Sequence, residues 1–157
     1  LRITKRSSAA VSALSKHTYR VCPRTEIGEN NMTIPSIKGV IEHLWTTEAG
    51  PRACIKLTYI GDNQIGWRCG YVETRLTLDD EPKLADVSCH GGITWFNKVS
   101  GFAELAVGFD CAHAWDNSIE SDTRKVSDGE VRSFNYCFEQ CEKLAKRIVA
   151  IETDYNL

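Results

Sequence analysis

Two short stretches of the sequence gather the side chains that could carry out chemistry. They are CHGG at residues 89–92 and GFDCAHAWD at residues 108–116. Imidazole titrates close to neutral pH, so the histidine in each stretch could act as a general acid or base, and the aspartates could orient it or bind a metal ion. If the stretches are neighbours in the fold, these groups could converge on one ligand. The predicted catalytic residues are His90, His113, Asp110 and Asp116.

The glycine pair that follows His90 suits a binding site for an anion. Glycine lets the backbone approach a ligand closely, and successive N–H groups can point at a phosphate. Tryptophan could stack on a base, and arginine could hold a phosphate with two N–H groups. A tight turn around a hydrogen-bonded histidine, core tryptophans and solvated arginines would explain the same residues without a ligand. The predicted ligand-binding residues are Gly91, Gly92, Thr94, Trp95 and Arg68.

Convergence of these groups places a demand on the chain after Asp110. Side chains alternate along a strand, so His113 would share a face with Cys111 but not with Asp110. The polar groups therefore cannot all line one strand face. A turn that begins near Ala112 would bring them together, and the hypothesis predicts such a turn.

The cofactor is left open by these residues, with a divalent metal ion as one alternative. The two histidines, with carboxylates or Cys111, are suitable ligands for zinc or another divalent ion, but their spacing matches no strong metal motif. A nucleophilic Cys89 or Cys111 beside a histidine is a further alternative, although both lie in apolar runs that predict burial. The seven cysteines form no CxxC pair and favour buried thiols in a reducing compartment. Cys137 and Cys141, four residues apart, are expected in the core.

Composition indicates one soluble domain inside a cell. The chain has 157 residues, of which 42% are hydrophobic and 25% charged. No stretch has the length of about 18 apolar residues expected of a membrane-spanning helix. The net charge of −2 is unevenly distributed, because residues 1–31 contain six Lys or Arg against two Glu and the remainder is acidic. An acidic body disfavours broad nucleic-acid binding, which needs a basic face.

The basic start of the chain is predicted to lie outside the functional domain. Residues 1–24 contain no acidic side chain and are rich in serine, alanine and basic residues. They fit a transit peptide, a disordered basic arm or a segment that is not native to the domain. The single methionine, Met32, follows residues that a purine-rich ribosome-binding site could encode. We therefore expect a bacterial or viral gene product that starts at Met32, with residues 32–157 as one domain.

Alternating apolar residues predict a β-hairpin followed by two more strands. RACIKLTYI at residues 52–60 places Ile55, Leu57 and Tyr59 on one face. After the turn-prone GDNQ, IGWRCGYVET at residues 65–74 alternates in the same way, with Ile65, Trp67, Cys69 and Tyr71 on one face. IPSIKGVIEHLW is ambiguous between a short helix and an edge strand, and RLTLDDEPKLAD reads as a loop. DVSCHGGITWF and AELAVGFDCAHAW are the further strand-like runs.

The C-terminal segment predicts an amphipathic helix of about five turns. Ser127 and Glu130 have the spacing of a capping box. Strands first and a long helix last predict an α+β fold in which an antiparallel sheet, a hairpin plus two further strands, is covered on one face by that helix. The apolar stripe comprises Val131, Phe134, Phe138, Cys141, Ala145 and Ile148, widened by Cys137, Leu144 and Ile151.

Three motifs resemble a family of small bacteriophage and prophage proteins. The motifs are WRCGYV at 67–72, HGGITW at 90–95 and GFDCAHAWD at 108–116, and the family carries W-x-C-G-Y-V, H-G-G-[IL]-T-[YW] and G-F-D-C-A-H-A-x-D in the same order. The resemblance covers residues 53–151. The family usually has glycine where this chain has Trp115, which affects the turn before Asp116. The resemblance implies a phage protein in the cytoplasm of a bacterial host, and it implies no particular activity.

Two functions follow as hypotheses. In the first, the protein binds a phosphorylated, nucleotide-like ligand, such as a host immune signal, and either sequesters it or hydrolyses a phosphate ester or phosphodiester. In the second, it is a non-enzymatic interaction protein that blocks a host protein, and the motifs only maintain the fold. A homodimer is compatible with both, and no membrane partner is expected.

Overall fold

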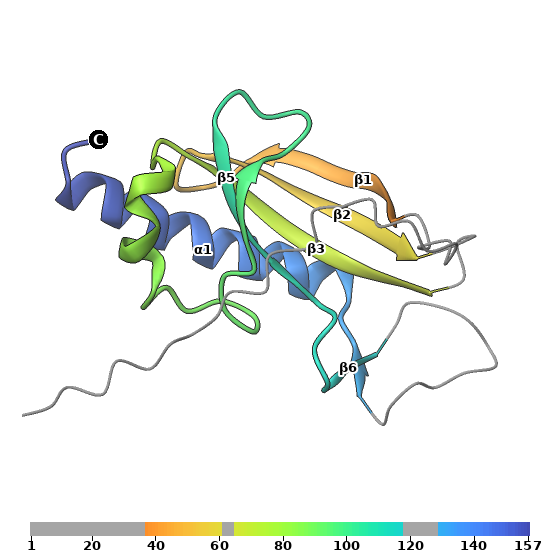
Figure 1. Cartoon of the computed structure of the whole chain (residues 1–157). Helices are drawn as coiled ribbons and strands as arrows, with labels where there is room; N and C mark the ends of the chain where they lie inside the picture. The colour runs from red at the N-terminus through yellow and green to blue at the C-terminus, as the bar shows by residue number, and fades with distance from the viewer. Residues whose placement is uncertain (1–36, 61–64, 118–128) are drawn as a thin grey trace, which may run out of the picture.

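A five-stranded antiparallel sheet with one long helix across one face makes up the body of the protein (Figure 1). The computed structural model describes residues 37–60, 65–117 and 129–157. The predicted extension at 1–31, the Met32 start and the GDNQ turn lie outside these residues. The strand order is β1-β2-β3-β5-β4, and the predicted α+β class is confirmed. The sheet consists of β1 (Ile37–Thr46), β2 (Arg52–Ile60), β3 (Ile65–Thr74), β4 (Trp95–Lys98) and β5 (Leu105–Asp110).

The predicted hairpin is the antiparallel pair of β2 and β3 at the centre of the sheet. Directly paired residues share a face, and Ile55 lies opposite Gly70 while Cys69 lies opposite Lys56. The two alternating stripes of the sequence therefore face opposite sides of the sheet. The side of Ile55 packs on the helix, and the other side carries a smaller apolar cluster. That cluster contains Cys54, Val99 and Ala106, with Tyr71, Trp95 and Phe102 packed against it.

The main core lies between the sheet and α1 (Phe134–Asp154). Gly70 allows their close approach, because a Cβ atom there would lie 2.4 Å from Cζ of Phe109 and 2.6 Å from Sγ of Cys141. The predicted apolar stripe is confirmed from Phe134 onward, whereas Val131 lies outside the helix and is exposed. The apolar residues that α1 buries are Cys137, Cys141, Leu144, Ala145 and Ile148.

The helix begins later than the capping-box pattern predicted. Ser127 lies outside the described residues, and Glu130 belongs to β7 (Glu130–Val131), which pairs in parallel with β6 (Asp116–Asn117). The N-cap is Ser133, whose Oγ accepts a hydrogen bond from the backbone N–H of Tyr136 at 3.1 Å. The first turn of α1 therefore follows directly on the short β6–β7 pair.

Replacing Ser133 by alanine should lower the free energy of unfolding by about 1 kcal/mol, because the N–H of Tyr136 loses its acceptor. Urea denaturation followed by circular dichroism measures the change. Ser127→Ala serves as the comparison. A loss of stability in Ser127→Ala that is absent from Ser133→Ala would contradict this helix start.

One ambiguous segment is resolved, and two others differ from their sequence-based interpretations. The ambiguous segment before residue 47 is the edge strand β1, and the predicted loop at 75–86 contains a 3₁₀ helix, η1 (Leu78–Leu84). The strand predicted across residues 86–96 is confined to β4, because the chain turns at Gly91 and Gly92, which both have positive φ. Among the described residues, no helix is both long enough and apolar enough to cross a membrane.

Candidate histidine and aspartate site

The turn that convergence required is present after β5. The strand ends at Asp110, and the N–H of Asp116 donates to the carbonyl of His113 at 2.9 Å. This turn lies against the 89–92 turn that precedes β4. Three of the four predicted catalytic residues, His90, His113 and Asp116, therefore meet although they come from two separate segments.

Asp116 is the centre of this group. Its Oδ2 lies 2.7 Å from Nε2 of His90 and 3.2 Å from Nδ1 of His113, and it also accepts the backbone N–H of His113. Its Oδ1 accepts a hydrogen bond from Nε of Arg132 at 2.7 Å. The side chain has 0% relative exposure, so these donors replace the water that the carboxylate would otherwise bind.

The charge of Asp116 is maintained by these contacts. Burial raises the pKa of the Asp116 carboxyl, but the hydrogen bonds from Arg132, His90 and the His113 backbone lower it by more, so the pKa lies below its usual range. Asp116 is therefore ionised at neutral pH, and its negative charge faces the two imidazoles.

His90 is buried, and both of its ring nitrogens have partners. Nε2 faces Asp116, and Nδ1 lies 2.8 Å from the hydroxyl of Tyr136. Burial raises the pKa of Tyr136, so its hydroxyl keeps its proton at neutral pH and can donate it to Nδ1. With Nδ1 as acceptor, Nε2 carries the hydrogen that is donated to Asp116. In this state His90 orients Asp116 and has no nitrogen free for a ligand's proton.

His113 is the more accessible of the two histidines. Its Nδ1 faces Asp116, which leaves the lone pair on Nε2 when Nδ1 donates. The indole of Trp115 stacks on the imidazole, with ring centroids 5.1 Å apart and planes at 9°. Trp115 itself is 54% exposed. A flat aromatic surface thus adjoins the histidine that can be reached from outside.

The imidazole of His113 packs directly against the backbone of Gly91. Its φ is +63°, and a Cβ atom there would lie 2.0 Å from Cε1 of His113. Gly92, with φ of +91°, would place a Cβ atom in open space, so it needs glycine only for its backbone conformation. The N–H of Gly92 donates to the carbonyl of Cys89 at 3.1 Å, so this hydrogen is not directed at a ligand.

The remaining predicted residues lie at the margin of the group or away from it. Asp110 is marginal, with Oδ1 4.0 Å from Nδ1 of His113 and a side chain 31% exposed. Arg68 binds Glu42 through Nε and Nη2 and donates Nη1 to the carbonyl of Arg132, so it supports the site from behind.

Trp95 belongs to β4 and Thr94 directly precedes that strand, so both lie outside this group. The N–H of Thr94 donates to the carbonyl of Gly108, and Trp95 packs edge-on against Tyr71 in the cluster on the far face. The aromatic side chain beside the imidazoles is Trp115, not Trp95.

Arg132 and Tyr136 are site residues that sequence reasoning missed. Arg132 holds Oδ1 of Asp116 and lies over the ring of Tyr136, with Cζ 5.0 Å from the ring centroid. The available signal was Ser133, which as an N-cap would have placed Arg132 directly before α1 and Tyr136 in its first turn. The capping-box pattern at Ser127 and Glu130 concealed it.

The group of His90, His113 and Asp116 could hold a metal ion. One ligand atom from each residue lies within 4.8 Å of the others. A tetrahedral ion with bonds of 2.0–2.1 Å requires ligand atoms about 3.4 Å apart, so small shifts would suffice. Metal-binding histidines and carboxylates are usually held by further hydrogen bonds, and here Tyr136 and Arg132 occupy those positions. Two imidazoles and one carboxylate also leave coordination positions open, as catalytic sites require.

The two cysteines considered as nucleophiles, Cys89 and Cys111, are poorly suited to that role. The six cysteines in the described residues are free. Burial raises the pKa of Cys89 to about 12. The pKa of Cys111 is also raised, first by its hydrogen bond with Cys137 and then by burial. Neither thiol is expected to ionise at neutral pH, which disfavours the cysteine-nucleophile alternative.

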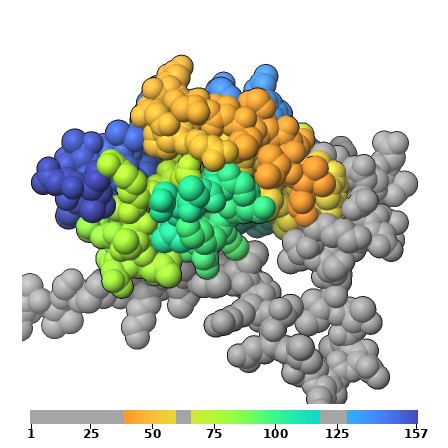
Figure 2. Space-filling view, turned by 90° about the horizontal axis from the view of Figure 1, so that it is seen from above, coloured from red at the N-terminus to blue at the C-terminus, as the bar shows by residue number. Residues whose placement is uncertain are grey.

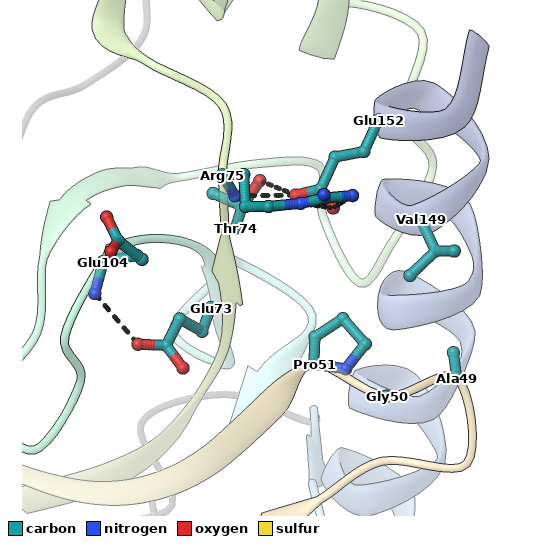
Figure 3. Close-up of a pocket in the computed structure, with 9 residues that line it drawn as sticks. All are labelled: Ala49, Gly50, Pro51, Glu73, Thr74, Arg75, Glu104, Val149 and Glu152. Carbon is teal, nitrogen blue, oxygen red and sulfur yellow. Dashed lines mark hydrogen bonds and ion pairs between the residues drawn. The ribbon is translucent and has the colours of Figure 1, made fainter. Parts of the chain in front are cut away.

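A cavity of about 340 Å³ lies elsewhere, between the ends of β3 and α1 (Figure 3). None of the predicted site residues lines it. A buried carboxylate in its lining, that of Glu152, is held by the Thr74 hydroxyl and by the backbone and guanidinium of Arg75. These contacts connect the end of α1 to the sheet, so Glu152 has a structural role here.

Comparisons with protein-family models, with curated proteins and with solved structures find no match for this chain.

Proposed function

We propose that this protein binds a divalent metal ion through His90, His113 and Asp116, and that it uses this site to bind and hydrolyse a phosphorylated ligand. The observation that carries the proposal is the meeting of two imidazoles and an ionised carboxylate from two segments, with the ligand atoms within 4.8 Å of one another. The reaction class would be hydrolysis of a phosphate ester or phosphodiester.

The roles of the side chains follow from their contacts. A bound divalent ion would polarise a phosphoryl oxygen and lower the pKa of a bound water. Arg132 holds Oδ1 of Asp116, which leaves Oδ2 to face the ion. To ligate the ion through Nε2, His90 would take the other tautomer, in which Nδ1 carries the hydrogen and donates it to the hydroxyl oxygen of Tyr136. Asp110, partly exposed and 4.0 Å from Nδ1 of His113, is the candidate to take a proton from the attacking water.

A nucleotide-like ligand is the class to test first. Trp115 stacks on His113 with one face and is 54% exposed, so a base could lie on its surface beside the phosphate site. The resemblance to phage proteins makes a host immune signal, met in the cytoplasm of the host, the specific candidate.

Isothermal titration with Zn²⁺, Mn²⁺ and Mg²⁺, followed by mass spectrometry of a panel of nucleotides incubated with the protein, tests the proposal. We expect one ion per chain, and at least tenfold weaker binding in His113→Ala, which removes one of three ligands. His43→Gln, a histidine change on β1 outside the site, should bind normally. Asp110→Asn should bind the ion but lose turnover. Absence of binding for all three ions in the unaltered chain would refute the proposal.

A non-enzymatic interaction protein is the second candidate, because the edge strand β1 exposes apolar side chains. Figure 2 shows β1 in orange along the surface of the molecule. Edge strands with apolar side chains are suited to pairing with a partner. Formation of a stable complex with a host protein that survives His113→Ala, together with no turnover of any ligand, would favour this candidate. The exposed residues are Val40, Ile41 and Leu44.

A further inference from the structure

Two buried thiols face each other at the base of the candidate site. Sγ of Cys111 lies 3.6 Å from Sγ of Cys137, and the two residues have relative exposures of 2% and 0%. Cys111 directly follows β5, and Cys137 lies in the first turn of α1. A covalent bond between them would therefore join the sheet to the helix.

Each thiol lies close in sequence to a residue that forms or positions the proposed metal site. Cys111 comes two residues before His113, on the segment that turns to place the imidazole against Asp116. Cys137 directly follows Tyr136, whose hydroxyl fixes the ring of His90. Movement of Cys111 is thus transmitted along the backbone to His113, and movement of Cys137 reaches His90 through Tyr136 and its hydrogen bond.

We propose that Cys111 and Cys137 form a reversible disulfide under oxidation by peroxide, and that this bond switches the site to a state of lower metal affinity. The second half of this inference rests on the proposed function. A disulfide has sulfurs about 2.05 Å apart, so the two sulfurs must approach each other by about 1.5 Å. The turn at 111–116 and the first turn of α1 must adjust, while metal binding tolerates only small displacements of its ligand atoms.

The reaction needs only hydrogen peroxide as oxidant. Sγ of Cys137, whose pKa is lowered by its hydrogen bond with Cys111, attacks a peroxide oxygen. The O–O bond breaks, and the departing hydroxide takes up the thiol proton as water. The resulting sulfenic acid is attacked by the second sulfur, whose proton leaves with the sulfenic hydroxyl as a second water. Two thiols are oxidised to one disulfide, and one peroxide is reduced to two waters. A dithiol reductant reverses the change by thiol–disulfide exchange.

Peptide mapping without reduction tests the bond itself. After treatment with hydrogen peroxide, the unaltered chain should lose the mass of two hydrogens and yield a linked peptide pair that contains Cys111 and Cys137. Cys137→Ala should yield no such pair. Cys141→Ala, which removes another buried thiol from the same helix face, should still form it. Absence of the linked pair in both the unaltered chain and Cys141→Ala would overturn the inference.

Titration with Co²⁺ tests the effect on the site, since its absorption distinguishes imidazole and carboxylate ligands from thiolate ligands. We expect oxidation to weaken Co²⁺ binding at least tenfold in the unaltered chain and to leave the Co²⁺ affinity of Cys137→Ala unchanged. Dithiothreitol should restore the original affinity of the oxidised chain. A linked pair with unchanged affinity would overturn the switch. Failure of the reduced chain to bind Co²⁺ would count against the proposed function instead, and the peptide map would still decide whether the bond forms.

Discussion

Replacing Asp116 by alanine is expected to abolish metal binding and to lower the free energy of unfolding by about 3 to 5 kcal/mol. The carboxylate is buried and is the shared acceptor for both imidazoles and for Nε of Arg132. Without it, the guanidinium and the ring N–H of His90 remain in a largely buried setting with an acceptor lost. Removing one member of a buried charged network costs more than the network's own net contribution, because the other members are left uncompensated.

Urea denaturation and Co²⁺ titration of the same preparation measure both consequences of this substitution. Asp116→Asn keeps the shape of the side chain and one acceptor oxygen, so its loss of stability should be smaller than that of Asp116→Ala. Its Co²⁺ binding should nevertheless be at least tenfold weaker than that of the unaltered chain, because the ligand charge is lost. Asp110→Ala is the matched control, because Asp110 is partly exposed and its Oδ1 accepts one hydrogen bond, from the N–H of Ala112, so its loss should cost only about 1 kcal/mol. Equal stability losses for Asp116→Ala and Asp110→Ala would contradict the central role assigned to Asp116.

The fold could be predicted from sequence where periodicity is strong. The alternation of β2 and β3 and the stripe of α1 from Phe134 to Ile151 both follow from burial of one face. The sequence could not show which apolar stripe of β2 and β3 faces α1, because that depends on which residue of one strand pairs with which residue of the other. Ile55 pairs with Gly70 and not with one of the large apolar residues of β3. The reason is the packing of α1, which leaves no room for a side chain at Gly70.

The candidate site was predictable as a set of residue types but not as an arrangement. The turn after Asp110 had to be assumed, because Ala112 to Trp115 carry no glycine or proline. The signal that was overlooked is Asp110 itself, whose Oδ1 accepts the N–H of Ala112 two residues on. Arg132 was hidden for a different reason. A capping-box pattern assigned Glu130 to the helix, whereas its N–H donates to the carbonyl of Trp115 and pairs β7 with β6. Tertiary pairing thus overrode a local signal, and Arg132 lies beside Asp116 as a result.

Replacing Gly91 by alanine is the second change with a large expected effect, and it separates the backbone from the site. Alanine at a φ of +63° costs about 1 to 2 kcal/mol by itself. The new methyl group would also lie 2.0 Å from Cε1 of His113, so the imidazole must leave the position in which it faces Asp116. We expect at least tenfold weaker Co²⁺ binding and a stability loss beyond the backbone cost.

Gly92→Ala is the matched control, because it has the same substitution, a positive φ and no atom within 4 Å of the new methyl group. It should lose stability through backbone strain and still bind Co²⁺ normally. The two effects of Gly91→Ala separate in a double-mutant cycle with His113→Ala, since removing the imidazole also removes the clash. In that background Gly91→Ala should cost only its backbone strain. An equal loss of stability from Gly91→Ala with and without the imidazole would contradict this interpretation. Gly91 would then be required only for the backbone conformation of the turn, and its contact with His113 would not position the site.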